Sequence, residues 1–563
     1  MSQLLVISAG TPRTLTDPSI SGLADAARHH GHRLAVLALG HGSRGPRGVA
    51  GPGLSGVTIH RFGATPLLRS FPSWGDARLR AALPAQLRRA GVQRPDAVIV
   101  TALDESVVLA RALSVQYDIP YFVGLLGRTQ LAGPAGGRFA QLLTHSVQEA
   151  SAVAASTPEL AEELRRRFTL PQVHVLTPPA GGHHDDALIE LCEHQVQEPP
   201  TAGRMVFHTP YPLDPSPVSA SRQRPNKMLS AFIQNGHRVH RITGLPFQRA
   251  LAFRDLRARV RAGQGIDFLY SENSTQPNIL ATSLRAGFAP LLEARILAFC
   301  ARRRIPAGQF YRDVYWRFAE SQRNVPLMRR ILMQVAYRAD VMILNRTGVH
   351  LFLPSLPMAP IIPFDLRRCT ALPPGAPLHE SSSPSGLHLL YVGGIGAGYA
   401  LDEGLRALQD VNSIRLTMVV RRDEWDKHQA TYAPLLTERV HVVHAGSDEL
   451  QEHYDAASAC LLLVAPDGYR KFAVPLKLYE YLGYGKPTLA SSGTLAGEMV
   501  EQMGIGFTVA NKRADIAELL RKLERDPSLL SRAADRAREV RHDHTWSQRA
   551  RTVADVLSGP GEA

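Results

Sequence analysis

One pattern recurs three times along this chain of 563 residues: an apolar strand, a loop rich in glycine, serine or proline, and then a helix. The three apolar segments are residues 4–8, 205–208 and 387–393. In the first two copies the helix ends at a Gly-His pair and a second apolar strand follows, which marks an internal repeat. Alternating strands and helices are typical of parallel sheets with helices on both faces. The sequence therefore predicts an α/β fold of three Rossmann-like domains, each built on a doubly wound parallel sheet.

Two polar segments separate the three copies. Residues 192–204 contain paired prolines, and residues 370–386 consist mainly of proline, serine and glycine. Such compositions are typical of linkers. They divide the chain into residues 1–195, 204–370 and 387–563. Because few contacts are expected to cross a linker, we expect residues from about 201 onward to fold without the first domain.

The formal net charge of +14 is carried largely by arginine and suits phosphate-rich partners. The arginines lie scattered along helices without an aromatic-interleaved stripe, so we expect no nucleic-acid partner. No apolar run reaches the roughly 20 residues that cross a bilayer, and the first ten residues lack a basic segment. We therefore expect a cytoplasmic protein. The four cysteines are far apart and no Asp-x-Asp motif occurs, so we expect neither a metal nor a disulfide.

The segment VPLKLYEYLGYGKPTLAS, residues 474–491, predicts a loop, a short helix, a turn and a strand. Pro475 suits the first turn of a helix, where its missing N–H is no loss. Lys477 and Glu480 are three residues apart, so they share one helix face near free N–H groups. That face suits a phosphate-bearing ligand. An exposed Lys–Glu pair worth a few tenths of a kcal/mol is the alternative, and these residues alone leave it open.

In order, five segments of residues 387–563 resemble the C-terminal half of GT-B glycosyltransferases, and more specifically the retaining family 4. They are YVGGIGAGYALDEGLRAL, IRLTMVV, VHVVHAGSDELQEHYDAASACLLLVAP, VPLKLYEYLGYGKPTLASS and GIGFTVANKRADIAELLRKL, and a helix containing DHTWSQRA closes the domain. Residues 204–370 resemble the N-terminal, acceptor-side half, with their Gly-His turn and the helix YRADVMILNR. Residues 1–195 resemble a further copy of that half, with DIPYFVGL and TPELAEELRRRF. The resemblance implies that the last two domains form a GT-B pair and that the first domain is extra.

The resemblance also implies which residues bind the donor. Glu480 falls on the family's glutamate that hydrogen-bonds the ribose, and Lys477 would face the diphosphate. The family's upstream glutamate is replaced here by Phe472, and the family's Arg and Lys after the first strand are absent. The remaining donor-side candidates are Pro475, Leu476, Gly394, Gly396, Arg421, Arg470 and Lys471.

On the acceptor side, residues 210–227 occupy the place of the family's glycine-rich loop, with Ser221 and Arg222 as candidates for an acceptor or phosphate contact. Arg312 and Asp313 follow a strand where the family places a catalytic-face His or Asp, although a buried Arg–Asp pair is an alternative. Glu272 and Asn273 are expected in a polar loop after another strand.

The implied function is transfer of a sugar from a nucleotide-diphosphate donor to a glycan or lipid-linked acceptor, with retention, in polysaccharide or glycoconjugate assembly. No cofactor is implied, and the choice between UDP and GDP stays open. We expect the first domain to be catalytically silent and to extend the acceptor surface, mediate assembly or contact an anionic membrane through the arginine-bearing helix at 159–168. Two alternatives remain: a non-catalytic GT-B-like binding or assembly module, and a sugar-nucleotide epimerase of the same fold.

Overall fold

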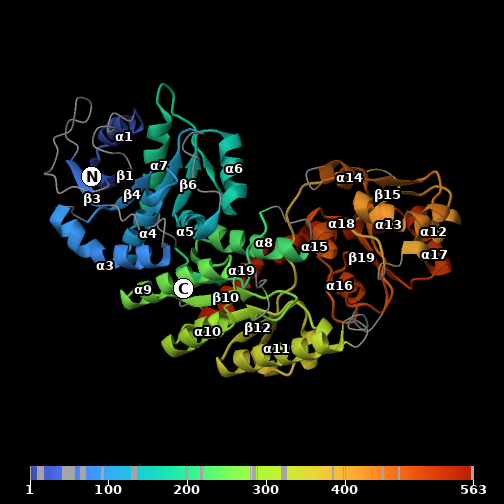
Figure 1. The fold of residues 1–563 in the computed structure, drawn as a ribbon. Helices are drawn as coiled ribbons and strands as arrows, with labels where there is room; N and C mark the ends of the chain where they lie inside the picture. Colours follow the sequence, from blue (N-terminus) through green and yellow to red (C-terminus); the bar gives the residue numbers. More distant parts are fainter. Residues whose placement is uncertain are drawn as a thin grey trace. The chain divides into compact units, whose positions relative to one another are not determined.

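Three parallel α/β sheets make up the protein (Figure 1), as the alternating pattern predicts. The chain forms two compact units, Met1–Gly308 with Ile331–Val349, and Gln309–Arg330 with His350–Ala563. The structure is a computed structural model, and it describes residues 2–8, 18–40, 58–63, 72–90, 94–127, 136–197, 201–215, 220–278, 281, 287, 289–318, 326–382, 384, 386–396, 399, 401–446, 449–466 and 470–559.

The first sheet has seven strands in the order β3-β2-β1-β4-β5-β6-β7. They are β1 (Gln3–Ser8), β2 (Arg33–Gly40), β3 (Thr58–Gly63), β4 (Ala97–Val100), β5 (Tyr121–Leu125), β6 (Ala152–Ala155) and β7 (His174–Val175). The helices are α1 (Pro18–His29), α3 (Pro72–Ala90), α4 (Glu105–Tyr117), α5 (Gly137–Gln148), α6 (Pro158–Phe168) and α7 (His184–Gln197).

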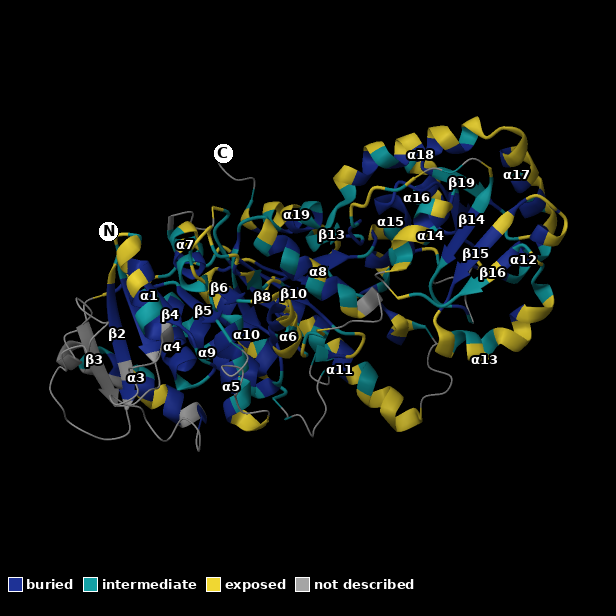
Figure 2. Ribbon diagram, turned by 90° about the horizontal axis from the view of Figure 1, so that it is seen from above, coloured by how far each residue is buried: buried dark blue, intermediate teal, exposed yellow. Residues whose placement is uncertain are grey.

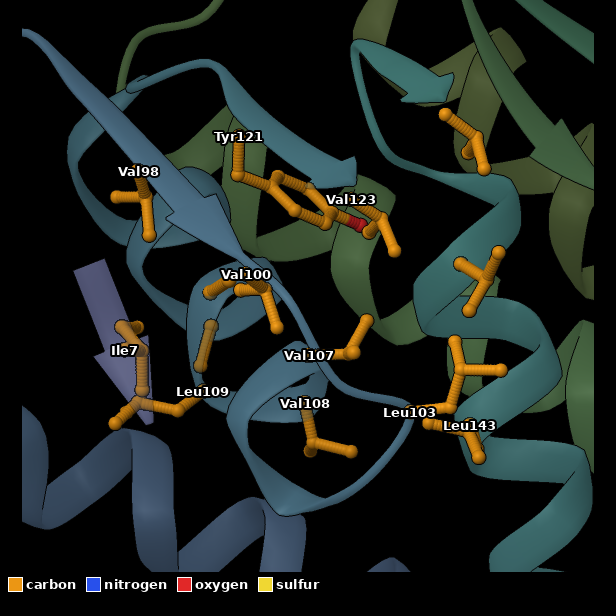
Figure 3. Close-up of a cluster of buried hydrophobic side chains, with 14 of the residues drawn as sticks. Ile7, Val98, Val100, Leu103, Val107, Val108, Leu109, Tyr121, Val123 and Leu143 are labelled. Atoms are coloured by element: carbon orange, nitrogen blue, oxygen red, sulfur yellow. The ribbon is translucent and has the colours of Figure 1, made fainter. Parts of the chain in front are cut away.

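Both faces of this sheet are buried. Ile7 and Val100 belong to one apolar cluster with Val107 of α4, and Figure 3 shows these side chains together. Val6 and Ile99, their neighbours in sequence, belong to a second cluster with residues of α1 and α7. Successive side chains of a strand point to opposite faces, so an unbroken apolar strand requires helices on both sides.

The second sheet has six strands in the order β13-β12-β11-β10-β8-β9. They are β8 (Arg204–His208), β9 (Arg238–Ile242), β10 (Phe268–Glu272), β11 (Ala307–Phe310), β12 (His350–Leu353) and β13 (Cys369–Ala371). Its helices are α8 (Ala220–Gln234), α9 (Pro246–Arg261), α10 (Leu292–Arg303) and α11 (Leu327–Arg346).

The repeated Gly-His pair ends α1 and α8 in the same way. Gly31 and Gly236 have φ values of +75° and +83°, in the left-handed region that glycine adopts without strain. The N–H of the following histidine then bonds a carbonyl of the last helical turn, at 2.8 Å for His32 and 3.0 Å for His237. The repeat is therefore a helix stop that turns the chain into β2 and β9.

The third sheet has six parallel strands in the order β16-β15-β14-β17-β18-β19. They are β14 (His388–Val392), β15 (Arg415–Val419), β16 (Val440–Val443), β17 (Ala459–Leu462), β18 (Thr488–Ser491) and β19 (Gly506–Val509). Its helices are α12 (Leu401–Gln409), α13 (Arg422–Tyr432), α14 (Leu450–Ala456), α15 (Leu476–Gly483), α16 (Leu495–Met503), α17 (Arg513–Arg525), α18 (Ser528–Val540) and α19 (Trp546–Ser558). The strand order reverses between β14 and β17, and ligands of such sheets bind beyond the carboxyl ends of the strands at that point.

Buried ion pairs join the first domain to the second within the same compact unit. Arg111 of α4 is fully buried and pairs with Asp76 of α3 and with Asp255 of α9. His145 of α5 also contacts Asp255, with Nε2 and Oδ2 2.9 Å apart. Burial alone would raise the pKa of Asp255, but the charges of Arg111 and Arg80 and the hydrogen bond from His145 hold it well below its usual value.

A second group of contacts crosses the same linker. Nδ1 of His240 in β9 lies 2.6 Å from Oε2 of Glu149 in the first domain. The guanidinium nitrogen Nη2 of Arg204 in β8 lies 2.5 Å from Oδ2 of Asp118, also in the first domain. Leu251 of α9 belongs to the apolar core of the first domain. The expectation that few contacts cross residues 192–204 is therefore wrong, because a linker's composition does not reveal what the domains on either side bury.

Candidate functional site

Lys477 lies in the first turn of α15, where Pro475 precedes the helix as the sequence predicts. Its side chain is only 9% exposed, and Nζ donates a hydrogen bond of 2.6 Å to the hydroxyl of Tyr391. Nζ also lies 4.1 Å and 4.0 Å from the ring centroids of Tyr391 and Tyr399. Burial lowers the pKa of Lys477 to about 7, against the opposing charge of Glu480. A nearby anion would raise this pKa again and favour the charged form.

The loop after β14 fits closely around Lys477. A Cβ on Gly393 would lie 2.4 Å from Lys477 Cε, and the φ of Gly393 is +127°. A Cβ on Gly394 would lie 2.6 Å from Glu424 Oε2, and a Cβ on Gly396 would lie 3.0 Å from His428 Nε2. At Gly393 and Gly394 a side chain would therefore require Lys477 or Glu424 to move. Gly393 was not among the predicted residues, although it adjoins Gly394 in the same run of glycines.

Glu424 at the start of α13 fixes this loop. One of its carboxylate oxygens accepts a hydrogen bond of 2.9 Å from the N–H of Ile395. Arg421 forms an ion pair with the same carboxylate. The charge of Arg421, a predicted donor-binding cation, is thus shared with Glu424, which the sequence analysis did not single out.

Glu480 and Arg470 lie close enough to Lys477 to affect its pKa, in opposite directions. Glu480 is half-buried on α15, on the same helix face as Lys477. Arg470 is also half-buried, and its guanidinium lies 5.7 Å from the ring centroid of Tyr399. Lys471 is exposed. The structure therefore brings Lys477, Glu480 and Arg470 together, with Lys471 on the solvent side.

Phe472, at the position of the family's upstream glutamate, is buried in the packing of its own unit. Its ring stacks on Phe318 with centroids 5.7 Å apart and planes at 24°. Its carbonyl accepts a hydrogen bond of 2.6 Å from the hydroxyl of Ser355. A phenyl ring in this place contributes apolar packing and offers no hydrogen bond to a sugar.

Asp313 follows β11 and is 8% exposed. Burial raises its pKa to about 6, while a hydrogen bond from the backbone of Tyr315 and the charge of Arg312 oppose the increase. A carboxyl group that titrates near neutrality at a strand end can move a proton. The same hydrogen bond also ties Asp313 to the first residue of the 3-10 turn Tyr315–Arg317, which is a structural role.

The other acceptor-side candidates are in different settings. Ser221 lies in the first turn of α8, and its side chain is outside the described part of the structure. Arg222 is exposed and forms an ion pair of 3.2 Å with Asp214. Asn273 is buried, and its carbonyl accepts a hydrogen bond of 3.3 Å from the hydroxyl of Tyr211.

Glu272 is not a loop residue, as was expected, but the last residue of β10, and it is fully buried. Its carboxylate accepts hydrogen bonds from Arg224 Nε at 3.1 Å and from the hydroxyl of Tyr270 at 2.8 Å. A buried carboxylate needs such partners. The expected loop position of Glu272 is therefore wrong, because the residue pairs with Arg224 inside the domain, and its acceptor-side role stays a prediction.

Sequence reasoning missed a buried cluster at the carboxyl end of β8. His208 Nδ1 lies 2.8 Å from Ser271 Oγ, and His208 Nε2 lies 3.0 Å from Glu293 Oε2. Arg249 donates to Glu293 Oε1 at 2.8 Å. The signal in the sequence is a histidine that ends an apolar strand. The other members of the cluster, Ser271 of β10, Glu293 of α10 and Arg249 of α9, have no such signal.

Two families of known proteins match the chain. The family described as "Glycosyl transferase 4-like domain" matches residues 17–181, in the first domain. The family described as "Glycosyl transferase-like" matches residues 403–555, in the third domain. No curated protein matches the chain. Among the described residues, no helix is both long and apolar enough to span a bilayer.

Solved structures of glycosyltransferases are similar at low identity. Anabaena HepE in complex with UDP and glucose has 13% identity and a TM-score of 0.43, over 63% of this chain and 99% of its own. WaaG, a glycosyltransferase involved in lipopolysaccharide biosynthesis, has 16% identity and a TM-score of 0.42, over 63% of this chain and 100% of its own. Sucrose-phosphate synthase from Thermosynechococcus elongatus has 12% identity and a TM-score of 0.27, over 99% of this chain and 98% of its own.

The two family matches lie in the first and last of three parallel α/β domains. Both families are glycosyltransferase families, and the second match spans the strands and helices that follow the Gly393 loop and includes Lys477 and Glu480. The chain therefore carries two glycosyltransferase domains, a family 4-like domain at residues 17–181 and a second one at residues 403–555.

Proposed function

We propose that the sugar donor is a nucleoside diphosphate sugar, bound at the carboxyl edge of the third sheet. The observation that carries this proposal is Lys477, a buried lysine under a glycine loop at the start of α15. Among the described residues, no carboxylate forms an ion pair with its ammonium group. Because a buried charge needs a counter-charge, a diphosphate would complete the site.

In the proposed reaction the donor's bond between the anomeric carbon and the phosphate oxygen breaks, and the acceptor oxygen bonds to that carbon on the same face. The acceptor's proton goes to the departing diphosphate. Lys477 and the N–H groups of α15 stabilise the charge that develops on the leaving group. Glu480 holds the ribose, and Asp313 acts on the acceptor side. The leaving nucleotide is UDP or GDP.

The proposed acceptor is a glycan or a lipid-linked glycan, in polysaccharide or glycoconjugate biosynthesis. A cytoplasmic enzyme that contacts the inner face of an anionic membrane would meet such an acceptor, and the net charge of +14 supports that contact. The helix first expected to make it, α6, is a weaker candidate, because Arg165 and Arg166 pair with Glu162.

A second candidate function is a binding or assembly module without catalysis. One observation favours it: Phe472 packs in the core at the place of a glutamate that the family commonly has. Such a module would bind its ligand without turning it over. An epimerase of the same fold would convert a nucleotide sugar without any acceptor.

Calorimetry with UDP and GDP, followed by a screen of nucleotide sugars for hydrolysis and transfer, separates these functions. A transferase should bind one of the two nucleotides. It should also release that nucleotide from the corresponding nucleotide sugars, and the rate of release should rise when the acceptor is added. Binding without turnover would favour the module. Conversion of the sugar without an acceptor would favour the epimerase, and no binding of either nucleotide would overturn the proposed donor site.

A further inference from the structure

Helix α11 has an apolar side that faces solvent. Ile331, Leu332 and Val335 are 50%, 58% and 58% exposed, and Figure 2 shows exposed stretches along this helix. Residues four apart lie on one side of a helix, so these side chains form a continuous stripe. The stripe continues at both ends through Leu327, Met328 and Met342, which are also exposed.

The opposite side of α11 packs normally. Ala336, Tyr337, Val341 and Leu344 are buried. The exposed stripe is therefore not the side by which this helix packs on the core. Single exposed apolar residues are common on protein surfaces, but a contiguous row of them requires an explanation. Arg329, Arg330, Arg338 and Arg346 are exposed on the same helix.

Helices α9 and α10 carry a second feature, a cleft of about 290 Å³ that is strongly basic. Phe253 and Phe299 are the apolar residues of its lining, with ring centroids 5.6 Å apart. The rest of its lining is arginine alone: Arg257, Arg261, Arg295, Arg302 and Arg303. Within the described part of the chain no carboxylate pairs with any of these five guanidinium groups.

The two features lie on the same face of the second sheet. Helices α9, α10 and α11 connect strands that follow one another in a single direction across that sheet. Crossover connections between parallel strands are right-handed, so connections that run in one direction place their helices on one face. Figure 1 shows α9, α10 and α11 in this order.

We propose that this face, formed by α9, α10 and α11, docks on an anionic lipid bilayer. The stripe of α11 enters the interfacial region, as amphipathic helices with basic flanks do, and the arginine cleft binds lipid phosphates. Charge complementarity favours an anionic lipid surface over a protein partner. The face combines an apolar row with arginines that have no described carboxylate partner, and the lining of the cleft contains no acidic residue. This docking face specifies where the membrane contact proposed above is made, and the choice of a membrane as the partner rests on that proposal.

The test is sedimentation of the full-length protein with vesicles of phosphatidylcholine alone or with added phosphatidylglycerol, in the absence of nucleotide. We expect binding to the anionic vesicles that weakens as salt is raised. The triple variant Ile331→Gln, Leu332→Gln and Val335→Gln should lower the partition constant about tenfold or more. Arg295→Gln with Arg302→Gln should lower it about tenfold, with a smaller loss at high salt.

Matched controls change the same residue types elsewhere. Leu366→Gln with Leu378→Gln removes exposed leucines of the other unit, and Arg165→Gln with Arg166→Gln removes arginines of α6. Both controls should bind vesicles like the unchanged protein. Absence of binding to anionic vesicles, or equal losses in the controls, would overturn the docking face.

Three further readouts separate the remaining outcomes. Calorimetry with inorganic phosphate alone should show little binding, and tight phosphate binding without vesicle binding would make the cleft a small-anion site and overturn the proposal. Light scattering that shows a dimer which the triple variant dissociates would assign the stripe to a second copy and also overturn it. UDP and GDP affinities of all variants should be unchanged, so a failed donor site and a failed docking face give different results.

Discussion

The ammonium group of Lys477 donates its hydrogen bond to the hydroxyl of Tyr391, a residue of the first strand of the third sheet, 86 positions earlier in the chain. The contact fixes the amine between the strand that opens the domain and the helix that carries the ribose candidate Glu480. It holds the amine in place before a ligand arrives, which reduces the ordering that binding requires.

Lys477→Met should reduce affinity for the nucleoside diphosphate far more than affinity for the nucleoside, because only the diphosphate carries the charge that the ammonium offsets. Calorimetry with both ligands measures the difference, and equal losses would make Lys477 structural. Since the folded pKa is about 7 and the unfolded pKa is higher, the unfolded state binds the extra proton above pH 7. The stability of the unchanged protein relative to Lys477→Met should therefore rise with pH from about 7 toward the pKa of a free lysine.

Gly393→Ala should also weaken diphosphate binding. The new Cβ would lie 2.4 Å from Lys477 Cε, so the lysine must move, and the φ of +127° adds strain. Gly446→Ala is the matched control, because the nearest side-chain atom would be 3.7 Å from its Cβ. Titration of both variants with nucleoside diphosphate checks the prediction. Equal affinity in the two variants would contradict it.

Glu480→Ala should weaken nucleotide binding about ten- to a hundredfold, since a hydrogen bond to a charged group contributes roughly 1.5 to 3 kcal/mol. Nucleoside binding should fall as much as diphosphate binding, in contrast to Lys477→Met. Calorimetry with nucleoside and nucleoside diphosphate is the measurement, and a circular dichroism spectrum shows whether the variant is folded. A folded variant with unchanged affinity would remove Glu480 from the site.

Asp313→Asn should lower turnover while nucleotide affinity stays nearly unchanged. The raised pKa of about 6 means that the folded protein binds a proton between the ordinary carboxyl range and pH 6 that the unfolded chain does not. Stability contributed by this group is thus present at low pH and lost as pH rises through 6. The neutral amide of the variant should therefore leave the melting temperature at pH 7.5 unchanged or higher. A variant that melts earlier and turns over normally would show that the carboxylate has only a structural role, through its hydrogen bond from the backbone of Tyr315.

Asp255→Asn should destabilise the protein by about 3 to 5 kcal/mol, because it leaves Arg111 buried without one of its two counter-charges. Denaturant unfolding measures the loss. Asp410→Asn, which breaks the exposed pair of Asp410 with Arg513, should change stability little.

A chain that begins near residue 201 should fold poorly, because Asp255 would then lack its partner Arg111. This prediction reverses the expectation from the linker alone. A stable, monomeric truncated protein would contradict the role given to these ion pairs.

The sequence predicts the three sheets because unbroken apolar strands alternating with helices have few other solutions. It also predicts that Lys477 and Glu480 share a face, since helix periodicity determines that relation. It does not predict that Tyr391 accepts the lysine's hydrogen bond, that Phe318 stacks on Phe472, or that Glu272 is enclosed by Arg224. These pairs are distant in sequence, and each residue type there is also common on a surface. The sequence around a residue does not indicate which distant residue it will contact, so these pairs become visible only in the folded structure.

The ion pair of Arg111 with Asp255 sets an order of events during synthesis. The two residues are 144 positions apart, and the first domain leaves the ribosome well before α9 has been made. Of the two described carboxylates that pair with Arg111, Asp76 belongs to the first domain and Asp255 to the second. We therefore expect the first domain to reach its final packing only after α9 has been translated, so that the two domains complete their folding together.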